Sequence, residues 1–133
     1  MAVVTCMDAR LDPWRFLGLA RGEATVIRNA GGVVTDDVVR SLVVSQRVLG
    51  SREIMVIHHT HCGMSTLSEP AITQEVEQET GLRLPFALET FADAFAEVRQ
   101  SLRRLEQTAY LVKDCVARGF VYDLDSDELF EAS

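Results

Sequence analysis

A chain of 133 residues with 47% hydrophobic residues is long enough for one domain with a substantial core. Its formal net charge of −7 argues against a nucleic-acid partner, because phosphate backbones are bound by basic faces. No apolar run approaches the length of a membrane span and no signal-peptide pattern opens the chain, so we expect a cytoplasmic protein without a membrane partner. The three cysteines are an odd number, which disfavours a disulfide framework and favours metal binding.

The first third of the chain alternates strand and helix signals. Ala2–Cys6 is apolar and rich in β-branched residues without a polar face, which predicts a buried strand. An aspartate followed by proline predicts a short helix over residues 13–19. Residues 23–28 form the second predicted strand, and a glycine-containing loop over residues 29–32 follows it.

Two helices and a third strand are predicted next. Acidic residues that suit the positive end of a helix dipole open a helix at about Thr35 that reaches about Leu49. Its candidate core positions are Val38, Val39, Leu42, Val43 and Leu49. Residues 53–58 are apolar in their middle and form the third strand, and the mostly polar residues 68–80 predict a surface helix.

The longest predicted helix covers residues 88–107. It shows an apolar stripe at helical spacing formed by Phe91, Phe95, Val98, Leu102 and Leu105. Residues 116–124 predict a fourth strand, and residues 128–131 a short strand antiparallel to it. The alternation predicts a single zinc-binding α/β domain over residues 1–133, with about four parallel strands, an antiparallel edge strand and helices on both faces.

Metal-ligating residue types stand where two predicted strands end. Cys6 ends the first strand, while His59 and Cys62 follow the third. Parallel sheets bind ligands at the carboxyl ends of their strands, so we expect these side chains to meet. Two thiolates and one imidazole suit a zinc ion with one coordination position left open. Cys115 could provide a fourth ligand, but it has no partner nearby in sequence and is better interpreted as a small buried hydrophobe.

Asp8 and Arg10 follow Cys6 at alternate positions, so an extended chain places all three on the same side. Arg10 can pair with Asp8 through two parallel hydrogen bonds and hold the carboxylate away from the metal. Asp8 could then accept a hydrogen bond from the zinc-bound water, whose pKa zinc lowers towards about 7. Without Arg10, Asp8 could occupy the open position itself. Without the metal-ligating residues nearby, a pair of Asp8 and Arg10 would be interpreted as an ordinary surface salt bridge. Arg28 is typical of a residue that anchors a loop.

These residues lie within motifs that resemble the β-class carbonic anhydrases, in particular their small prokaryotic branch. The motifs span nearly the whole chain and read CMDAR at 6–10, RNAGG at 28–32, TDD at 35–37, HTHCG at 59–63 and GFVYD at 119–123. The resemblance implies reversible hydration of carbon dioxide to bicarbonate and a proton. The residues that it implies are Cys6, His59 and Cys62 as Zn²⁺ ligands, Asp8 and Arg10 as the catalytic dyad, and Gly31 and Gly32 as a wall of the substrate pocket. It also implies a homodimer or higher homo-oligomer.

Two features depart from the family pattern. Members usually carry an N-terminal helical arm before the first strand, and this chain begins at that strand. We therefore expect either a less stable dimer or another element that covers the same surface. Position 61 is usually Asp, Gly or another small or acidic residue in the family, whereas this chain has His61. This histidine could relay protons to solvent, or it could be a solvent-facing loop residue without a role.

Two other functions fit the same residues. A carbonyl sulfide or carbon disulfide hydrolase would use the same zinc scaffold with a different pocket width and access. A non-catalytic, zinc-stabilised binding domain would have a closed fourth position. The presence of both Asp8 and Arg10 argues against the non-catalytic domain, because a structural zinc site does not need them.

Overall fold

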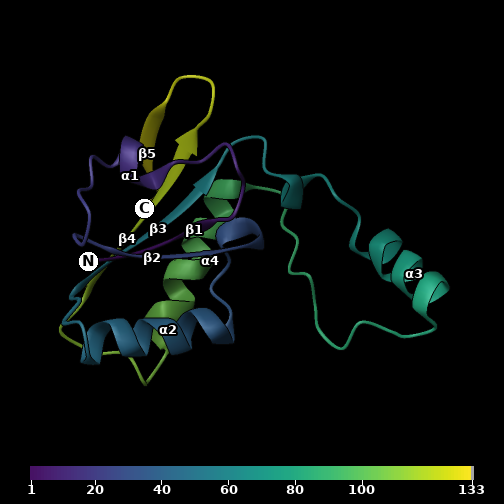
Figure 1. The fold of residues 1–133 in the computed structure, drawn as a ribbon, viewed down its shortest axis with the longest axis horizontal. Coiled ribbons are helices and arrows are strands. Elements are labelled where there is room, and N and C mark those ends of the chain that lie inside the picture. Colours follow the sequence, from purple (N-terminus) through teal and green to yellow (C-terminus); the bar gives the residue numbers. More distant parts are fainter. Residues whose placement is uncertain (133) are drawn as a thin grey trace.

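The computed structural model describes residues 1–132, which form one five-stranded sheet with the order β2-β1-β3-β4-β5 (Figure 1). Four strands run parallel, and β5 is antiparallel to β4. The bounds are β1 (Ala2–Cys6), β2 (Thr25–Asn29), β3 (Glu53–His59), β4 (Val116–Asp123) and β5 (Glu128–Ala132). The predicted α/β fold with an antiparallel edge strand is confirmed.

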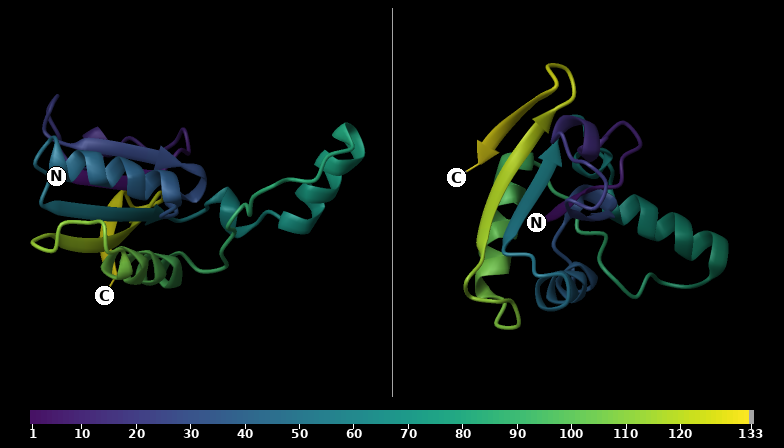
Figure 2. Two further views of the ribbon diagram at one scale, coloured as in Figure 1. Left: turned by 90° about the horizontal axis from the view of Figure 1, so that it is seen from below. Right: turned by 60° about the vertical axis from the view of Figure 1, so that its left-hand side comes forward.

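The helices are α1 (Pro13–Phe16), α2 (Asp36–Arg47), α3 (Glu69–Thr80) and α4 (Ala94–Gln107). Two 3-10 turns that the sequence did not predict, η1 (Ala30–Gly32) and η2 (Gly63–Ser65), follow β2 and β3. Figures 1 and 2 show α2 and α4 on one face of the sheet and the short α1 on the other. Within residues 1–132, no helix is both long and apolar enough to cross a bilayer.

The core has two layers because successive strand residues point to opposite faces of the sheet. Val4 and Val56 pack with Leu42 of α2 on one face, while Val3 and Ile57 lie in a second cluster on the other. All five of these side chains are fully buried. Buried strands therefore hold the carboxyl ends of β1 and β3 rigidly beside each other.

The helix predicted over residues 88–107 begins six residues later than expected. The Asp93 side chain accepts a hydrogen bond from the Phe95 backbone N–H at 3.0 Å and caps α4. Phe91 therefore precedes the helix and packs edge-on against His58, with ring centroids 5.2 Å apart. Phe95, predicted to be core, is 38% exposed. The prediction of Leu49 as a core position was also wrong, because α2 ends at Arg47 and the Leu49 side chain is 66% exposed.

Candidate metal centre

The carboxyl ends of β1 and β3 bring three metal-ligating side chains together. The sulfur atoms of Cys6 and Cys62 and an imidazole nitrogen of His59 lie within 4.8 Å of one another. All three residues are buried, with exposed fractions of 4%, 3% and 1%. The strands that carry Cys6 and His59 are adjacent and parallel, which explains why residues so far apart in sequence meet.

The imidazole of His59 is oriented for metal binding. Its Nδ1 lies 2.7 Å from the backbone carbonyl oxygen of Thr60, which can only accept, so Nδ1 donates the hydrogen bond. Nε2 then carries the lone pair, and it is buried without a hydrogen-bond partner within residues 1–132. A buried acceptor without a partner is costly, and ligation of a cation removes that cost. Two sulfurs and this nitrogen fit tetrahedral zinc with a fourth position for another ligand.

Hydrogen bonds at the site favour a thiolate. The neighbouring Cys62 thiol lowers the pKa of Cys6 to about 4. Backbone N–H groups of Asp8 and Gly31 also lower the pKa of Cys6, whereas burial raises it. The pKa of Cys62 is raised, first by its hydrogen bond to Cys6 and then by burial. A coordinated cation would deprotonate this second thiol as well.

Asp8 and Arg10 form the predicted bidentate pair beside the three ligands. Arg10 Nε donates to Asp8 Oδ1 at 3.0 Å, and Nη2 donates to Oδ2 at 2.7 Å. The Arg10 backbone N–H also donates to Oδ1 at 2.9 Å. These hydrogen bonds hold the pKa of the Asp8 carboxyl well below its usual range. Asp8 Oδ2 lies 3.9 Å from His59 Nε2, so the carboxylate stands at the edge of the ligand cluster.

Arg28 anchors the loop that carries Cys6 and Asp8. Its guanidinium donates to the backbone carbonyl oxygens of Cys6 at 2.9 Å, Asp8 at 2.8 Å and Leu11 at 3.2 Å. The interpretation of Arg28 as a loop anchor is confirmed. Sequence reasoning did not connect it with the metal ligands, and its position in the RNAGG motif was the signal available.

Gly31 and Gly32 lie in η1, directly beside the end of β1. Gly32 has φ +70°, and a Cβ there would stand 2.9 Å from the carbonyl carbon of Thr5. Gly31 has φ +85°, and a Cβ there would stand 3.1 Å from Met64 Cγ and from Phe91 Cε1. Both positions therefore need glycine, for conformation and for space. Their role as a wall of a substrate pocket stays a prediction.

His61 is exposed, with φ +55°, and its Nε2 lies 3.0 Å from Asp125 Oδ2. Its backbone carbonyl oxygen accepts a hydrogen bond from Arg10 Nη2 at 2.8 Å. The two loops that carry the dyad and Cys62 are thus joined through the backbone of this residue.

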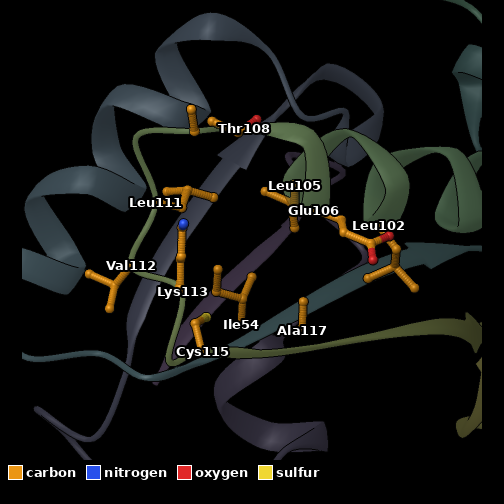
Figure 3. Close-up of a pocket in the computed structure, with 11 residues that line it drawn as sticks. Ile54, Leu102, Leu105, Glu106, Thr108, Leu111, Val112, Lys113, Cys115 and Ala117 are labelled. Carbon is orange, nitrogen blue, oxygen red and sulfur yellow. The ribbon is translucent and has the colours of Figure 1, made fainter.

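A cavity of about 630 Å³ lies away from the metal centre (Figure 3). Its lining includes Ile54 and Ala117, which stand near the amino ends of β3 and β4, opposite the edge that carries His59. Cys115 lines this cavity, is half-buried, and does not belong to the ligand cluster. The structure therefore agrees with excluding Cys115 from the predicted ligands.

The chain is similar to known proteins both in sequence and in structure. Residues 1–124 match the family model described as carbonic anhydrase. The chain is 51% identical over 133 residues to the protein named beta-carbonic anhydrase 1 of Mycobacterium tuberculosis, covering 100% of this chain and 82% of that relative. The crystal structure of carbonic anhydrase from Streptococcus mutans superposes with a TM-score of 0.93 at 39% identity, covering 99% of this chain and 80% of that chain. A carbon disulfide hydrolase of Acidithiobacillus thiooxidans is 31% identical over 153 residues, covering 96% of this chain and 70% of the relative.

Proposed function

The chain belongs to the β-carbonic anhydrase family, a family of lyases, and we propose that it catalyses the zinc-dependent, reversible hydration of carbon dioxide to bicarbonate and a proton. One observation supports this proposal most strongly. The buried Nε2 of His59 has no hydrogen-bond partner in residues 1–132, faces two cysteine sulfurs, and stands 3.9 Å from the Asp8 carboxylate.

Cys6, His59 and Cys62 would hold the zinc ion. Three protein ligands are typical of catalytic zinc sites, which keep one position for water or substrate. When bound, zinc would supply the Lewis-acid chemistry that makes water a competent nucleophile near neutral pH. The carbonyl of Thr60 fixes the tautomer and the ring orientation of His59, as outer-shell partners of zinc ligands commonly do.

Asp8 would orient the attacking water. Its low pKa keeps the carboxylate ionised at neutral pH, so it accepts a hydrogen bond and stores no proton. Arg10 occupies both carboxylate oxygens and keeps Asp8 from taking the open coordination position. The dyad thus positions the nucleophile and holds the site open.

An apolar wall beside the metal ligands suits an apolar substrate. Gly31 lies between the side chains of Met64 and Phe91, and its backbone N–H faces Cys6. Carbon dioxide has little to gain from hydrogen-bond donors in its ground state, so an apolar surface next to the nucleophile is sufficient to receive it.

Hydrolysis of carbon disulfide or carbonyl sulfide is the second candidate. Its support is the similarity to a protein named carbon disulfide hydrolase, over nearly the whole chain. Carbon disulfide is a linear, apolar triatomic molecule like carbon dioxide, so the same three ligands and the same dyad could serve both reactions.

Paired assays on the zinc-loaded protein separate these candidates. We expect stopped-flow measurements to show carbon dioxide hydration, and sulfide-release assays with carbonyl sulfide and carbon disulfide to show much lower kcat/KM. The reverse ranking would assign the hydrolase function instead. Activity towards none of the three substrates would favour a non-catalytic zinc-stabilised domain. We do not expect that result, because the Asp8–Arg10 pair beside the metal ligands favours an enzyme.

We further propose that the chain acts as a homodimer or higher homo-oligomer, as its similarity to the family implies.

A further inference from the structure

Thr60 follows His59 directly at the end of β3, and two of its three polar groups bind to the end of β4. Its backbone N–H donates to the Tyr122 carbonyl oxygen at 3.0 Å. Its hydroxyl accepts a hydrogen bond from the Leu124 backbone N–H at 3.0 Å and donates to Asp123 Oδ1 at 3.5 Å. Figure 1 shows the turn between β4 and β5 beyond the tip of β3, where this half-buried threonine reaches it.

The third polar group of Thr60 faces the metal centre. Its carbonyl oxygen accepts the hydrogen bond from His59 Nδ1 at 2.7 Å. The His59 side chain is buried, and its remaining nitrogen lies beside the two cysteine sulfurs. A ring N–H must point at the carbonyl oxygen that it binds, so the plane of the peptide between residues 60 and 61 sets the rotation of the imidazole. It thereby sets the direction of the lone pair that would bind the metal.

That peptide leads into a strained residue. His61 has φ +55°, in the left-handed region that residues other than glycine seldom adopt. Such a conformation persists only where the surrounding structure holds it. On one side Arg10 Nη2 donates to the His61 carbonyl oxygen at 2.8 Å, and on the other the Thr60 hydroxyl is held by Leu124. Loss of the hydroxyl would therefore let the Thr60 carbonyl turn away from His59.

The turn that holds the hydroxyl is itself anchored. Arg15 of α1 donates to both carboxylate oxygens of Asp127, at 2.8 and 2.9 Å, and to the Tyr122 hydroxyl at 3.1 Å. The Asp125 backbone N–H donates to Asp123 Oδ1 at 2.9 Å inside the turn. Tyr122 is buried and also stacks on a phenylalanine ring of α1, with centroids 4.2 Å apart. The turn is therefore a fixed support for Thr60 rather than a free loop.

We propose that Thr60 is a positioning residue of the metal centre, whose hydroxyl, held by the β4–β5 turn, fixes the carbonyl that orients His59 towards zinc. This inference rests on the proposed zinc enzyme and extends its metal centre to a side chain that is not a ligand. Thr60 acts through His59 rather than on the substrate. A hydroxyl has one donor and can accept as well, and both capacities are used here, so valine cannot replace it and serine can.

The zinc Kd of the full chain, measured by competition with a chromophoric chelator, tests the proposal. Thr60→Val keeps the shape of the side chain and removes the hydroxyl, so we expect the Kd to rise about 10–100-fold, as for other outer-shell partners of zinc ligands. Thr60→Ser keeps the hydroxyl and should keep the wild-type Kd. The matched control is Thr108→Val, at another half-buried threonine, whose hydroxyl donates to the Arg104 carbonyl oxygen at 2.7 Å at the end of α4. It should leave the Kd unchanged.

Cobalt absorption gives a second measurement, which a loss of stability alone would not change. The ligand-field bands of Co²⁺ bound in place of zinc should shift in Thr60→Val and match wild type in Thr60→Ser and Thr108→Val. A wild-type Kd and spectrum in Thr60→Val would overturn the proposal even if urea unfolding showed a less stable protein. Equal impairment of Thr60→Ser and Thr60→Val would overturn it as well.

These measurements follow metal binding rather than catalysis, so they separate this inference from the proposed function. A wild type that binds zinc without hydrating carbon dioxide would contradict the function and leave the role of Thr60 standing. A wild type that binds neither metal would overturn both.

Discussion

The Arg10 guanidinium engages both carboxylate oxygens of Asp8, with Nε 3.0 Å from Oδ1 and Nη2 2.7 Å from Oδ2. The same Nη2 reaches the carbonyl oxygen of His61 at 2.8 Å, next to Cys62 in sequence. One side chain therefore fixes the orientation of the carboxylate and joins it to the loop that bears a metal ligand. This explains both the low pKa of Asp8 and its position beside the ligands rather than among them.

Arg10→Ala should lower kcat/KM for carbon dioxide hydration about 10–100-fold while zinc stays bound, because Asp8 becomes able to take the open position. Stopped-flow kinetics with zinc analysis of the same samples measures both effects. The control is Arg118→Ala, which removes a bidentate pair with Glu131 on the exposed surface of β4 and β5. Activity equal to that of the control would show that Arg10 does not hold the site open.

Cys62→Ser should weaken zinc binding by more than the roughly 10–100-fold typical of an outer-shell change, because it removes a direct ligand. The free energy of unfolding should fall with it, since metal binding is coupled to folding. Equilibrium dialysis and urea unfolding give the two quantities. Cys115→Ser is the matched control, because this thiol lies outside the ligand cluster and should leave zinc stoichiometry unchanged. Full zinc retention in Cys62→Ser would refute the ligand assignment.

Gly32→Ala should destabilise the fold more than Gly18→Ala does. Both glycines have positive φ, +70° and +64°, so each alanine costs about 1–2 kcal/mol of backbone strain. Only at Gly32 does the added Cβ also meet backbone, 2.9 Å from the Thr5 carbonyl carbon, whereas Gly18 has open space around it. Urea unfolding should show the larger loss for Gly32→Ala, together with weaker zinc binding. Equal losses would mean that η1 can move away from β1 without consequence.

His58 should make stability depend on pH. It is fully buried, and burial lowers its pKa to about 4 from the ordinary 6.5. The folded state therefore binds fewer protons at His58 than the unfolded state does between these values. The contribution of His58 to stability is complete above about pH 6.5 and is lost as pH falls towards about 4. At about 1.4 kcal/mol per pH unit, the total loss from this group is roughly 3–4 kcal/mol.

Replacing this imidazole with a non-titrating ring, as in His58→Phe, should flatten that dependence. Urea unfolding of metal-free wild type and variant between pH 4 and 7 measures it. Removing the metal excludes pH-dependent metal release, and protonation of the ligand cysteines is common to the two proteins, so the difference between their slopes reports His58. Identical pH slopes in the two proteins would show that another group is responsible.

The strands and the ligand cluster could be predicted because buried parallel strands have continuous apolar runs and a common carboxyl edge. The start of α4 was predicted too early because Phe91 and Phe95 are spaced as on one helix. The Asp93 cap separates them, and Phe91 packs against His58 and next to Gly31 instead. The contacts of Arg28 could not be predicted from the sequence either. A sequence shows that an arginine follows a strand, but not which carbonyl oxygens of another strand end it will reach.

X-ray absorption at the zinc edge of the purified protein tests the central claim most directly. Two sulfur ligands at about 2.3 Å, one nitrogen at about 2.0–2.1 Å and one light oxygen neighbour are the predicted coordination shell. A shell of four sulfur and nitrogen ligands, or a folded protein that takes up no zinc, would contradict it.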